Sequence, residues 1–340
     1  MGCLYIGYTY LVVSLLTASE GHWFTLFLLS DGSVYSCGDN EAFKLGLGKD
    51  NWFQDNPTKI PGLSNIQKIS AGYAHSLALD KKGHVYVWGA NEYGQLYPGG
   101  PKYLKAPKRL PHLKNISSIS AASERSLALD SSGFVWEWGK KSNKVASSPH
   151  CLSELSNIVW IGAADIFSLA LDKDGRLYCW QSTNSFINFF EIPKKPEPLP
   201  FYKKIISASA GSRHALFQSE DGILYGFGIN LDYRFDSSSF PEFSIAPVEL
   251  EIKSAKFLKS FVAGKKFSAF LTRNNRVYFQ GTPTELNSNQ SLMTYKSPTI
   301  IKISNPMYKK ALFFASSAFP PYPKETESAW RKILGSEIAL

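Results

Sequence analysis

Residues 69–80 read Ile69-Ser70-Ala71-Gly72-Tyr73-Ala74-His75-Ser76-Leu77-Ala78-Leu79-Asp80, and residues 83–89 read Gly83-His84-Val85-Tyr86-Val87-Trp88-Gly89. The first segment carries an alternating Ser-Leu-Ala-Leu pattern, and the second alternates aromatic and aliphatic side chains. The glycine between them tolerates the positive φ of a tight turn. Together the two segments predict a β-hairpin.

The hairpin pattern is repeated along the chain. If Ser76 is taken as the anchor, the equivalent positions are Thr25, Ser126, Ser168, Ala215 and Ser268, with a fainter copy at Lys310. Successive anchors are 51, 50, 42, 47, 53 and 42 residues apart. A turn residue follows each of the first six anchors at Gly32, Gly83, Gly133, Gly175, Gly222 and Asn275, and an aromatic residue then stands at Tyr35, Tyr86, Trp136, Tyr178, Tyr225 and Tyr278. Such regular spacing is typical of propellers and solenoids.

We therefore predict an all-β fold, a seven-bladed β-propeller that occupies residues 1–320 as one domain, with a C-terminal tail at 321–340. The hydrophobic share of 44% and the aromatic share of 14% are sufficient for a large packed core. Proline-containing stretches such as 57–63 and 106–111 are expected to form outer strands and crossings between blades, because proline cannot donate to a central ladder.

The N-terminal segment is predicted to close the ring. Residues 2–7 read Gly-Cys-Leu-Tyr-Ile-Gly and imitate the strand at 83–89, whereas the seventh copy runs into Pro320 and Pro321 and has lost this strand. Pairing of the two chain ends would remove both open edges. One blade is expected to be incomplete, because only 14 residues separate Gly7 from Gly21.

Residues 11–16 leave a second interpretation open, since they also resemble the apolar part of a signal peptide. The positively charged segment that normally precedes such a part is missing, and the stretch is short for a membrane span. We favour a propeller strand, and no membrane partner is expected.

Reactive side chains do not form a recognisable catalytic or metal-binding motif. The four cysteines, Cys3, Cys37, Cys151 and Cys179, include no close pair, which favours a reducing compartment, and no cofactor is predicted. His75 and His214 share one repeat position, so we interpret them as structural hydrogen-bonding residues and not as general bases. The tryptophans Trp88, Trp138 and Trp180 also share one strand position and are interpreted as packing residues.

Basic residues offer the best lead to a binding site. The formal net charge is +9, which favours an acidic partner. The candidate partner-binding residues are Lys102, Lys105, Lys108, Arg109, Lys114, Lys140, Lys141 and Lys144. We expect them to gather on one side, because equivalent loops of a propeller lie on the same side. The alternative is an ordinary solvated surface.

The repeat resembles that of the regulator of chromosome condensation family. The resemblance is carried by Ala-Gly-x-x-His-Ser-Leu-Ala-Leu at 71–79, by Gly-x-Val-Tyr-x-Trp-Gly at 83–89 and by Asn-Glu-Tyr-Gly-Gln-Leu at 91–96. It covers roughly residues 18–315 and implies a seven-bladed propeller. The sequence departs from the family pattern at Gln181, which replaces the closing glycine, and the Gly-Gln-Leu-Gly turn is only partly kept at 94–96 and 45–48.

The resemblance implies a function in protein binding. Single-propeller members similar to the alpha-tubulin suppressor act as partner subunits in tRNA wobble-uridine and diphthamide modification complexes. We expect a monomeric, non-catalytic scaffold or regulatory subunit in the cytoplasm or nucleus. The alternatives are exchange activity on a small GTPase such as Ran, or binding to chromatin and histones through a basic face. No repeat interval exceeds 53 residues, which leaves no room for the wedge that the founding exchange factor uses.

Overall fold

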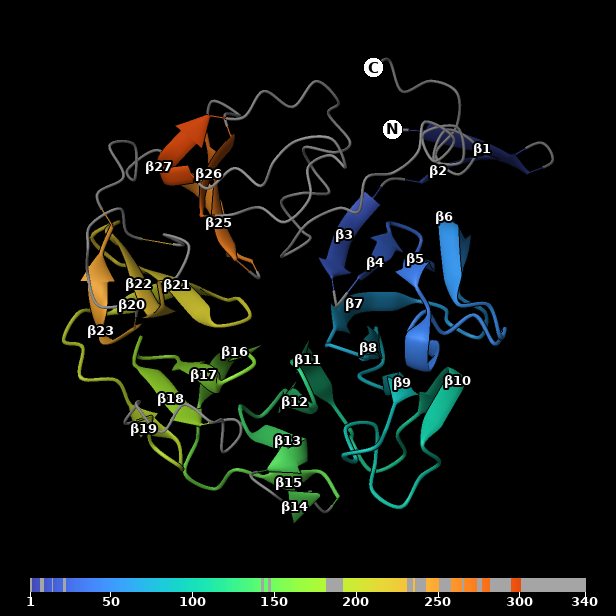
Figure 1. The fold of residues 1–340 in the computed structure, drawn as a ribbon, viewed down its shortest axis with the longest axis horizontal. Helices are drawn as coiled ribbons and strands as arrows, with labels where there is room; N and C mark the ends of the chain where they lie inside the picture. Colours follow the sequence, from blue (N-terminus) through green and yellow to red (C-terminus); the bar gives the residue numbers. More distant parts are fainter. Residues whose placement is uncertain are drawn as a thin grey trace.

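The structure is a computed structural model. It describes residues 2–6, 9–13, 15–20, 23–141, 144–145, 148–181, 192–230, 235, 243–250, 258–264, 266–273, 277–281 and 295–300. The backbone alone is described for residues 2–6, 9–13, 15–20, 141, 144–145, 243–245, 277, 279 and 295–300. Within these residues the fold is all-β, and the sheets are arranged as blades around a central axis (Figure 1).

Six antiparallel sheets form the blades. Blade 1 contains β3 (Leu15–Glu20), β4 (Phe24–Leu29), β5 (Val34–Asp39) and β6 (Phe53–Lys59). Blade 2 contains β7 (Ile66–Ala71), β8 (His75–Asp80), β9 (Val85–Ala90) and β10 (Tyr103–Arg109). Blade 3 contains β11 (Ile116–Ala121), β12 (Arg125–Asp130), β13 (Val135–Lys141), β14 (Lys144–Val145) and β15 (His150–Cys151). Blade 4 contains β16 (Ile158–Ala163), β17 (Phe167–Asp172), β18 (Leu177–Gln181) and β19 (Glu197–Pro198). Blade 5 contains β20 (Ile205–Ala210), β21 (His214–Ser219), β22 (Leu224–Ile229) and β23 (Phe243–Glu249). Blade 6 contains β24 (Leu258–Ala263), β25 (Phe267–Thr272), β26 (Val277–Gly281) and β27 (Tyr295–Ile300).

The propeller prediction is confirmed, and the described residues form six of the seven predicted blades. The first six anchors each lie in the second strand of a blade. The seventh, at Lys310, and the predicted tail at 321–340 lie outside the described residues. This copy has Ser317 where the others have the turn residue and Pro320 where they have the aromatic residue, so its sequence lacks the two features that define the hairpin.

The second strand of each blade is buried because neighbouring blades cover both of its faces. All six residues of β4, β8 and β17 are buried. The register of β8 on β9 pairs Ser76 with Trp88 and Ala78 with Tyr86, so a small residue faces each ring across the ladder. Because both faces of the strand are buried, its sequence is Ser-Leu-Ala-Leu, with no alternation of polar and apolar residues.

A recurring aspartate and glycine fix the turn between the second and third strands. Asp80 Oδ1 accepts hydrogen bonds from the backbone N–H groups of Lys82 and His84, both at 2.9 Å. Gly83 adopts φ +79, and a Cβ there would lie 3.0 Å from the backbone nitrogen of Ile116 in the next blade. The glycine is therefore required both for the turn and for the approach of blade 3. Asp130 and Asp172 make the same pair of backbone contacts in blades 3 and 4.

Hydrogen bonds between the innermost strands hold adjacent blades together. Ser70 Oγ of β7 accepts from Ala121 N of β11 at 2.8 Å. Ser120 and Ser209 accept in the same way from Ala163 and Ala263, at 2.9 and 3.0 Å. The serine hydroxyl thus replaces a ladder partner where two sheets converge on the axis.

The N-terminal segment forms a strand, and the C-terminal segment with which it is predicted to close the ring lies outside the described residues. β1 (Gly2–Ile6) pairs with β2 (Thr9–Val13), from Gly2 opposite Val13 to Ile6 opposite Thr9, as a separate two-stranded sheet. A local hairpin needs a much shorter loop than pairing across the ring, so its entropic cost is lower. The predicted incomplete blade is not blade 1, because blade 1 obtains four strands from β3 to β6.

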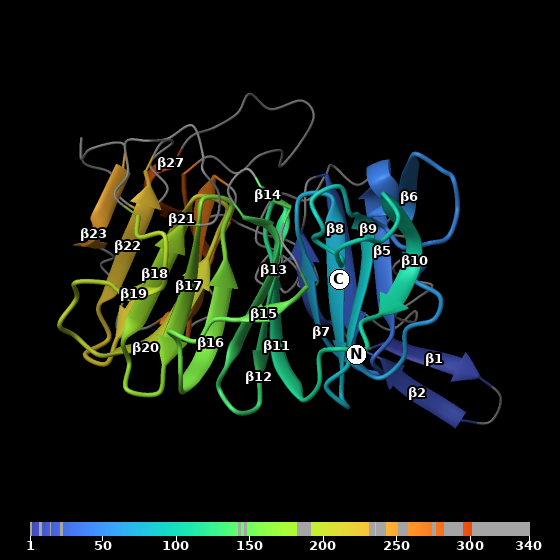
Figure 2. The same cartoon turned by 90° about the horizontal axis from the view of Figure 1, so that it is seen from below.

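The blades present two different ends, which Figure 2 shows from the side. In blade 2, the turn at 72–74 and the loop at 91–102 lie at one end, which we call the long-loop face. The turn at 81–84 and the crossing at 110–115 lie at the opposite end, which we call the tight-turn face. The antiparallel ladders place the corresponding segments of every blade on the same two faces.

Candidate interaction surfaces

In blades 2 and 5 the residue that precedes the anchor is a histidine that links its blade to the next. His75 Nε2 lies 3.0 Å from Ser126 Oγ, and His214 Nε2 lies 3.0 Å from Ser268 Oγ. Both histidines are completely buried. Their interpretation as structural residues is therefore confirmed, since each ring bonds to the anchor hydroxyl of the following blade.

The hydrogen-bond network fixes the protonation of His75. Ser126 Oγ donates its single proton to Gln95 O at 2.9 Å, so His75 must donate its Nε2–H to that hydroxyl. Burial lowers the pKa of His75 to about 3, which keeps the ring neutral. A Cβ on Gly72 would lie 2.5 Å from His75 Cε1, so the glycine makes room for the ring.

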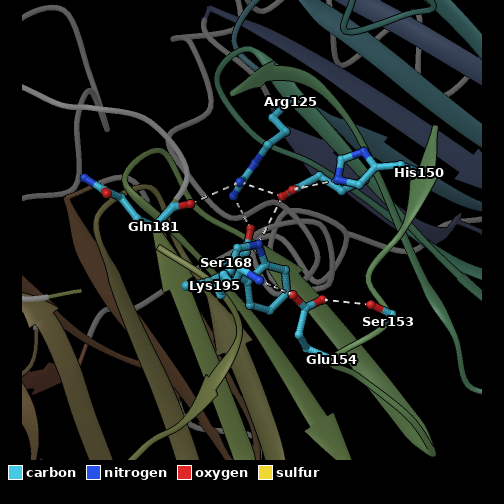
Figure 3. Close-up of polar contacts among 9 residues, drawn as sticks. Arg125, His150, Ser153, Glu154, Ser168, Gln181 and Lys195 are labelled. Carbon is cyan, nitrogen blue, oxygen red and sulfur yellow. Dashed lines mark hydrogen bonds and ion pairs between the residues drawn. The ribbon is translucent and has the colours of Figure 1, made fainter. Parts of the chain in front are cut away.

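Blade 3 has a buried ion pair that the sequence analysis did not identify. Arg125 replaces the histidine of blade 2, and its Nη1 donates to Glu137 Oε1 at 2.6 Å, with both side chains 2% exposed. Arg125 Nη2 donates to Ser168 Oγ (Figure 3). This contact corresponds to the one that His75 makes with Ser126. Burial lowers the pKa of Arg125, and the Glu137 carboxylate opposes that shift.

Glu137 also accepts a hydrogen bond from blade 4. Trp180 Nε1 donates to Glu137 Oε1 at 3.0 Å, and His150 Nε2 lies 3.8 Å from Oε2. In blade 2 the equivalent Trp88 donates instead to the backbone oxygen of Lys44, at 2.9 Å. The carboxylate therefore takes over the role that a loop carbonyl has in blade 1. The sequence did hold a sign of this ion pair, because Arg125 and Glu137 have opposite charges and occupy the repeat positions of His75 and Val87 in blade 2.

The predicted basic residues do not form one field. The stretch from Lys102 to Lys114 contains β10, which runs from the long-loop face to the tight-turn face. Leu104 is opposite Gly89, near the end of β9, whereas Arg109 is opposite Tyr86, near its start. The expectation that these residues share one side is therefore wrong, because an outer strand crosses the full height of its blade.

Carboxylates neutralise three of the predicted lysines near the long-loop face. Lys102 pairs with Glu92 at 2.7 Å, Lys105 pairs with Asp50 of blade 1 at 2.5 Å, and Lys140 pairs with Glu124 at 2.6 Å. Two of these ammonium groups also lie over rings of a neighbouring blade, Lys105 over Phe43 at 4.7 Å and Lys140 over Tyr93 at 4.3 Å. These lysines join blades at least as much as they present charge to a partner.

The remaining predicted residues occupy different positions. Lys108 Nζ donates to Tyr97 Oη at 2.9 Å within blade 2. Lys141 and Lys144 are opposite each other in the β13–β14 pair, and their side chains lie outside the described part of the structure. Arg109 and Lys114 are exposed at the tight-turn face.

Exposed aromatic side chains gather on the long-loop face of blades 1 and 2. Trp52 is 79% exposed and Trp23 is 54% exposed, and Phe53 and Tyr73 are also exposed. The backbone brings three of them together, because Trp23 O accepts from Asp39 N, Trp52 O accepts from Asn40 N, both at 2.8 Å, and Phe53 is opposite Asp39. Sequence reasoning missed this cluster, since exposure cannot be read from residue type.

The described residues hold no group of three or more histidine, cysteine or acidic side chains that could bind a metal. A search of the same residues found no helix long and apolar enough to cross a membrane. Cys37 and Cys179 are buried, and Cys151 is exposed.

The repeats match known family descriptions. Residues 31–79 and 82–129 match the family described as "Regulator of chromosome condensation (RCC1) repeat", and residues 18–42 and 66–95 match a second description of the same repeat. Residues 18–129 thus carry RCC1-type repeats, and the resemblance found in the sequence is confirmed over this part of the chain.

Relatives of known name match over short segments. The human protein named "Probable E3 ubiquitin-protein ligase HERC3" is 40% identical over 85 residues, which are 24% of this chain and 8% of that protein. The Saccharomyces cerevisiae "Guanine nucleotide exchange factor SRM1" is 33% identical over 94 residues, 24% of this chain and 19% of that protein. The chain therefore matches less than a quarter of the length of either relative.

Solved structures match over most of the chain. Human WBSCR16 superposes with a TM-score of 0.72 at 20% identity, covering 86% of this chain and 83% of that one. Prp20p from Saccharomyces cerevisiae, described with its binding properties to Gsp1p and histones, gives a TM-score of 0.71 at 24% identity, covering 84% and 76%. At these identities the likeness establishes the shared propeller fold.

Proposed function

We propose that this chain is a non-catalytic protein-interaction platform, a scaffold or regulatory subunit whose partner docks on the long-loop face of blades 1 and 2. The observation that supports this proposal is the cluster of Trp23, Trp52, Phe53 and Tyr73, all exposed on that face. Large aromatic side chains are enriched in the centres of protein interfaces, where they supply contact area at low entropic cost.

The backbone of Trp23 adds a second reason. Trp23 has φ +64, a left-handed conformation that bulky residues rarely adopt. Such strain costs about 1–3 kcal/mol and persists where the surrounding structure imposes it, often at functional positions. The hydrogen bond from Asp39 N to Trp23 O holds the residue in this conformation, so its ring is presented to solvent at the cost of local stability.

The non-catalytic part of the proposal is supported by the placement of reactive side chains. His75 and His214, the histidines that recur in the repeat, are buried and bonded to serines of the next blade. Neither can reach a solvent-borne substrate in this conformation. Arg125 and Glu137 are likewise occupied by each other.

The identity of the partner stays a hypothesis. A subunit role in a tRNA wobble-uridine or diphthamide modification complex is our first choice. Exchange activity on a small GTPase is a second candidate, favoured by the similarity to SRM1. Histone binding is a third, favoured by the structural similarity to Prp20p. The predicted location in the cytoplasm or nucleus also stays a prediction.

Affinity purification with mass spectrometry tests the proposal. The tagged full chain is compared with Trp52→Ala/Tyr73→Ala, and with Tyr202→Ala as a control, because Tyr202 is 91% exposed but lies in the crossing before blade 5. A partner that is retained by the wild type and the control and lost by the double variant supports the platform. Equal recovery from all three chains would contradict it.

An exchange assay separates the first two candidates. Release of labelled nucleotide from Ran is measured with the purified chain at catalytic concentration. We expect no acceleration of nucleotide release. If the wild type accelerates the release and Trp52→Ala/Tyr73→Ala does not, the exchange function replaces the scaffold proposal.

A further inference from the structure

The tight-turn face of blade 2 carries four exposed cations, Lys81, Lys82, Arg109 and Lys114, which we call the blade 2 cation patch. None of the four has an ion-pair partner among the residues that the structure describes, in contrast to Lys102, Lys105 and Lys140 near the opposite face. We propose that this patch binds a short acidic segment of a partner protein. The inference rests on the proposed platform function and adds a second surface to it.

The chain brings the four cations to one end of the blade. Lys81 and Lys82 lie in the turn after β8, and Lys114 lies in the crossing that leads to blade 3. These two segments are joined by the hydrogen bond from Ile116 N to Gly83 O at 3.3 Å. Arg109 ends β10 opposite Tyr86, two residues beyond the same turn. The positive charges therefore converge from three segments onto one surface.

The carboxylate within this turn does not neutralise the patch. Asp80 is 5% exposed and accepts hydrogen bonds from the backbone N–H groups of Lys82 and His84. Its second oxygen pairs with His84 Nδ1 at 2.9 Å. These contacts lower the pKa of Asp80 against the effect of its burial, and they occupy the carboxylate inside the turn. The four exposed cations are consequently available to bind an external anion.

Carboxylates on both neighbouring blades limit the length of that anion. Asp31 is exposed in the equivalent turn of blade 1, at the position that Lys82 occupies in blade 2. Glu154 is exposed in the crossing after blade 3 and pairs with Lys195 at 3.3 Å, so this crossing offers no unpaired cation at that point. A long rod of negative charge such as duplex DNA would be repelled by Asp31 on one side of blade 2 and would gain no attraction from the Glu154–Lys195 pair on the other. A short acidic peptide segment fits between them.

Fluorescence anisotropy provides the test. A labelled glutamate-rich peptide, its glutamine-for-glutamate version and a labelled DNA duplex are titrated with the full chain at low and at physiological ionic strength. Lys81→Glu/Lys82→Glu/Lys114→Glu removes the patch. Lys49→Glu/Lys102→Glu/Lys105→Glu is the matched control, because it changes the net charge equally with exposed residues of the opposite face.

We expect the glutamate-rich peptide to bind in a salt-dependent manner, to lose affinity about tenfold or more in the patch variant and to change about twofold or less in the control. An equal loss in both variants would show attraction by net charge alone and overturn the proposal. Tighter, patch-dependent binding of the duplex would overturn it in favour of nucleic acid. Circular dichroism confirms that both variants are folded. If purification recovers partners that the patch variant retains, the platform stands and the patch proposal fails.

Discussion

His75 Nε2 in blade 2 lies 3.0 Å from Ser126 Oγ in blade 3, and the serine hydroxyl in turn donates a hydrogen bond to Gln95 O. The neutral ring is therefore a structural element between two blades, and any proton added to it must be accommodated in a buried site. Its pKa is lowered to about 3 by burial.

The first prediction is that His75 makes the fold sensitive to acid. In the unfolded chain its pKa is the ordinary value of about 6.5, so below that pH the unfolded state binds a proton that the folded state does not. The free energy of unfolding should thus fall as the pH decreases from about 6.5 towards 3, by about 1.4 kcal/mol per pH unit for this residue. Denaturant unfolding at a series of pH values measures the slope.

His75→Gln is the comparison for this measurement. Glutamine can still donate to Ser126 Oγ but does not titrate, so the variant should be less stable at neutral pH and should show a smaller slope. Identical slopes in the two proteins would mean that other groups cause the acid sensitivity.

The second prediction concerns the Arg125–Glu137 pair. Glu137→Val leaves the buried guanidinium of Arg125 without its counter-charge, and we expect a loss of about 3–5 kcal/mol in the free energy of unfolding. The double variant Arg125→His/Glu137→Val copies the residues of blade 2, His75 and Val87. It should recover much of the loss, since a neutral histidine can donate to Ser168.

A double-mutant cycle by chemical denaturation measures this coupling. Additive losses from the two single substitutions would show that the ion pair does not act as a unit.

The third prediction is that Lys105→Glu/Lys108→Glu/Arg109→Glu changes thermal stability little. The Lys105–Asp50 pair is exposed, with side-chain exposures of 52% and 73%, and exposed pairs contribute about 0–1 kcal/mol. Only Arg109 of the three belongs to the blade 2 cation patch, so the triple variant should weaken an acidic partner less than Lys81→Glu/Lys82→Glu/Lys114→Glu. Differential scanning fluorimetry reports the stability, and a fall in the melting temperature of more than about 8 °C would exceed what exposed pairs explain.

The sequence predicted the parts of the fold that depend on local pattern. The anchor, the turn glycine and the aromatic position were readable because each blade repeats the same hairpin, and the position of His75 could be assigned to structure for the same reason. The partners of the lysines were not readable. Asp50 and Lys105 are 55 residues apart and meet only because blade 1 packs against blade 2.

Two further features depend on geometry that residue type does not encode. The exposure of Trp23 follows from its left-handed backbone, and tryptophan itself favours burial. The pairing of β1 with β2 is favoured by the short loop between them, because closing a short loop costs little entropy.

The last prediction follows from that pairing and reverses the expectation from sequence. β1 and β2 bond only to each other among the described strands, so deletion of residues 1–13 removes a self-contained hairpin and leaves the four strands of blade 1 paired. We expect the shortened chain to remain monomeric, with a melting temperature close to that of the full chain. Deletion of residues 1–20 also removes β3, whose ladder joins Leu15 to Leu29 and Glu20 to Thr25. That second deletion exposes the edge of β4, all of whose residues are buried, and should cause aggregation. Size-exclusion chromatography and thermal unfolding of both shortened chains provide the measurement. Aggregation of the chain that lacks only residues 1–13 would show instead that the N-terminal hairpin protects an edge of the propeller.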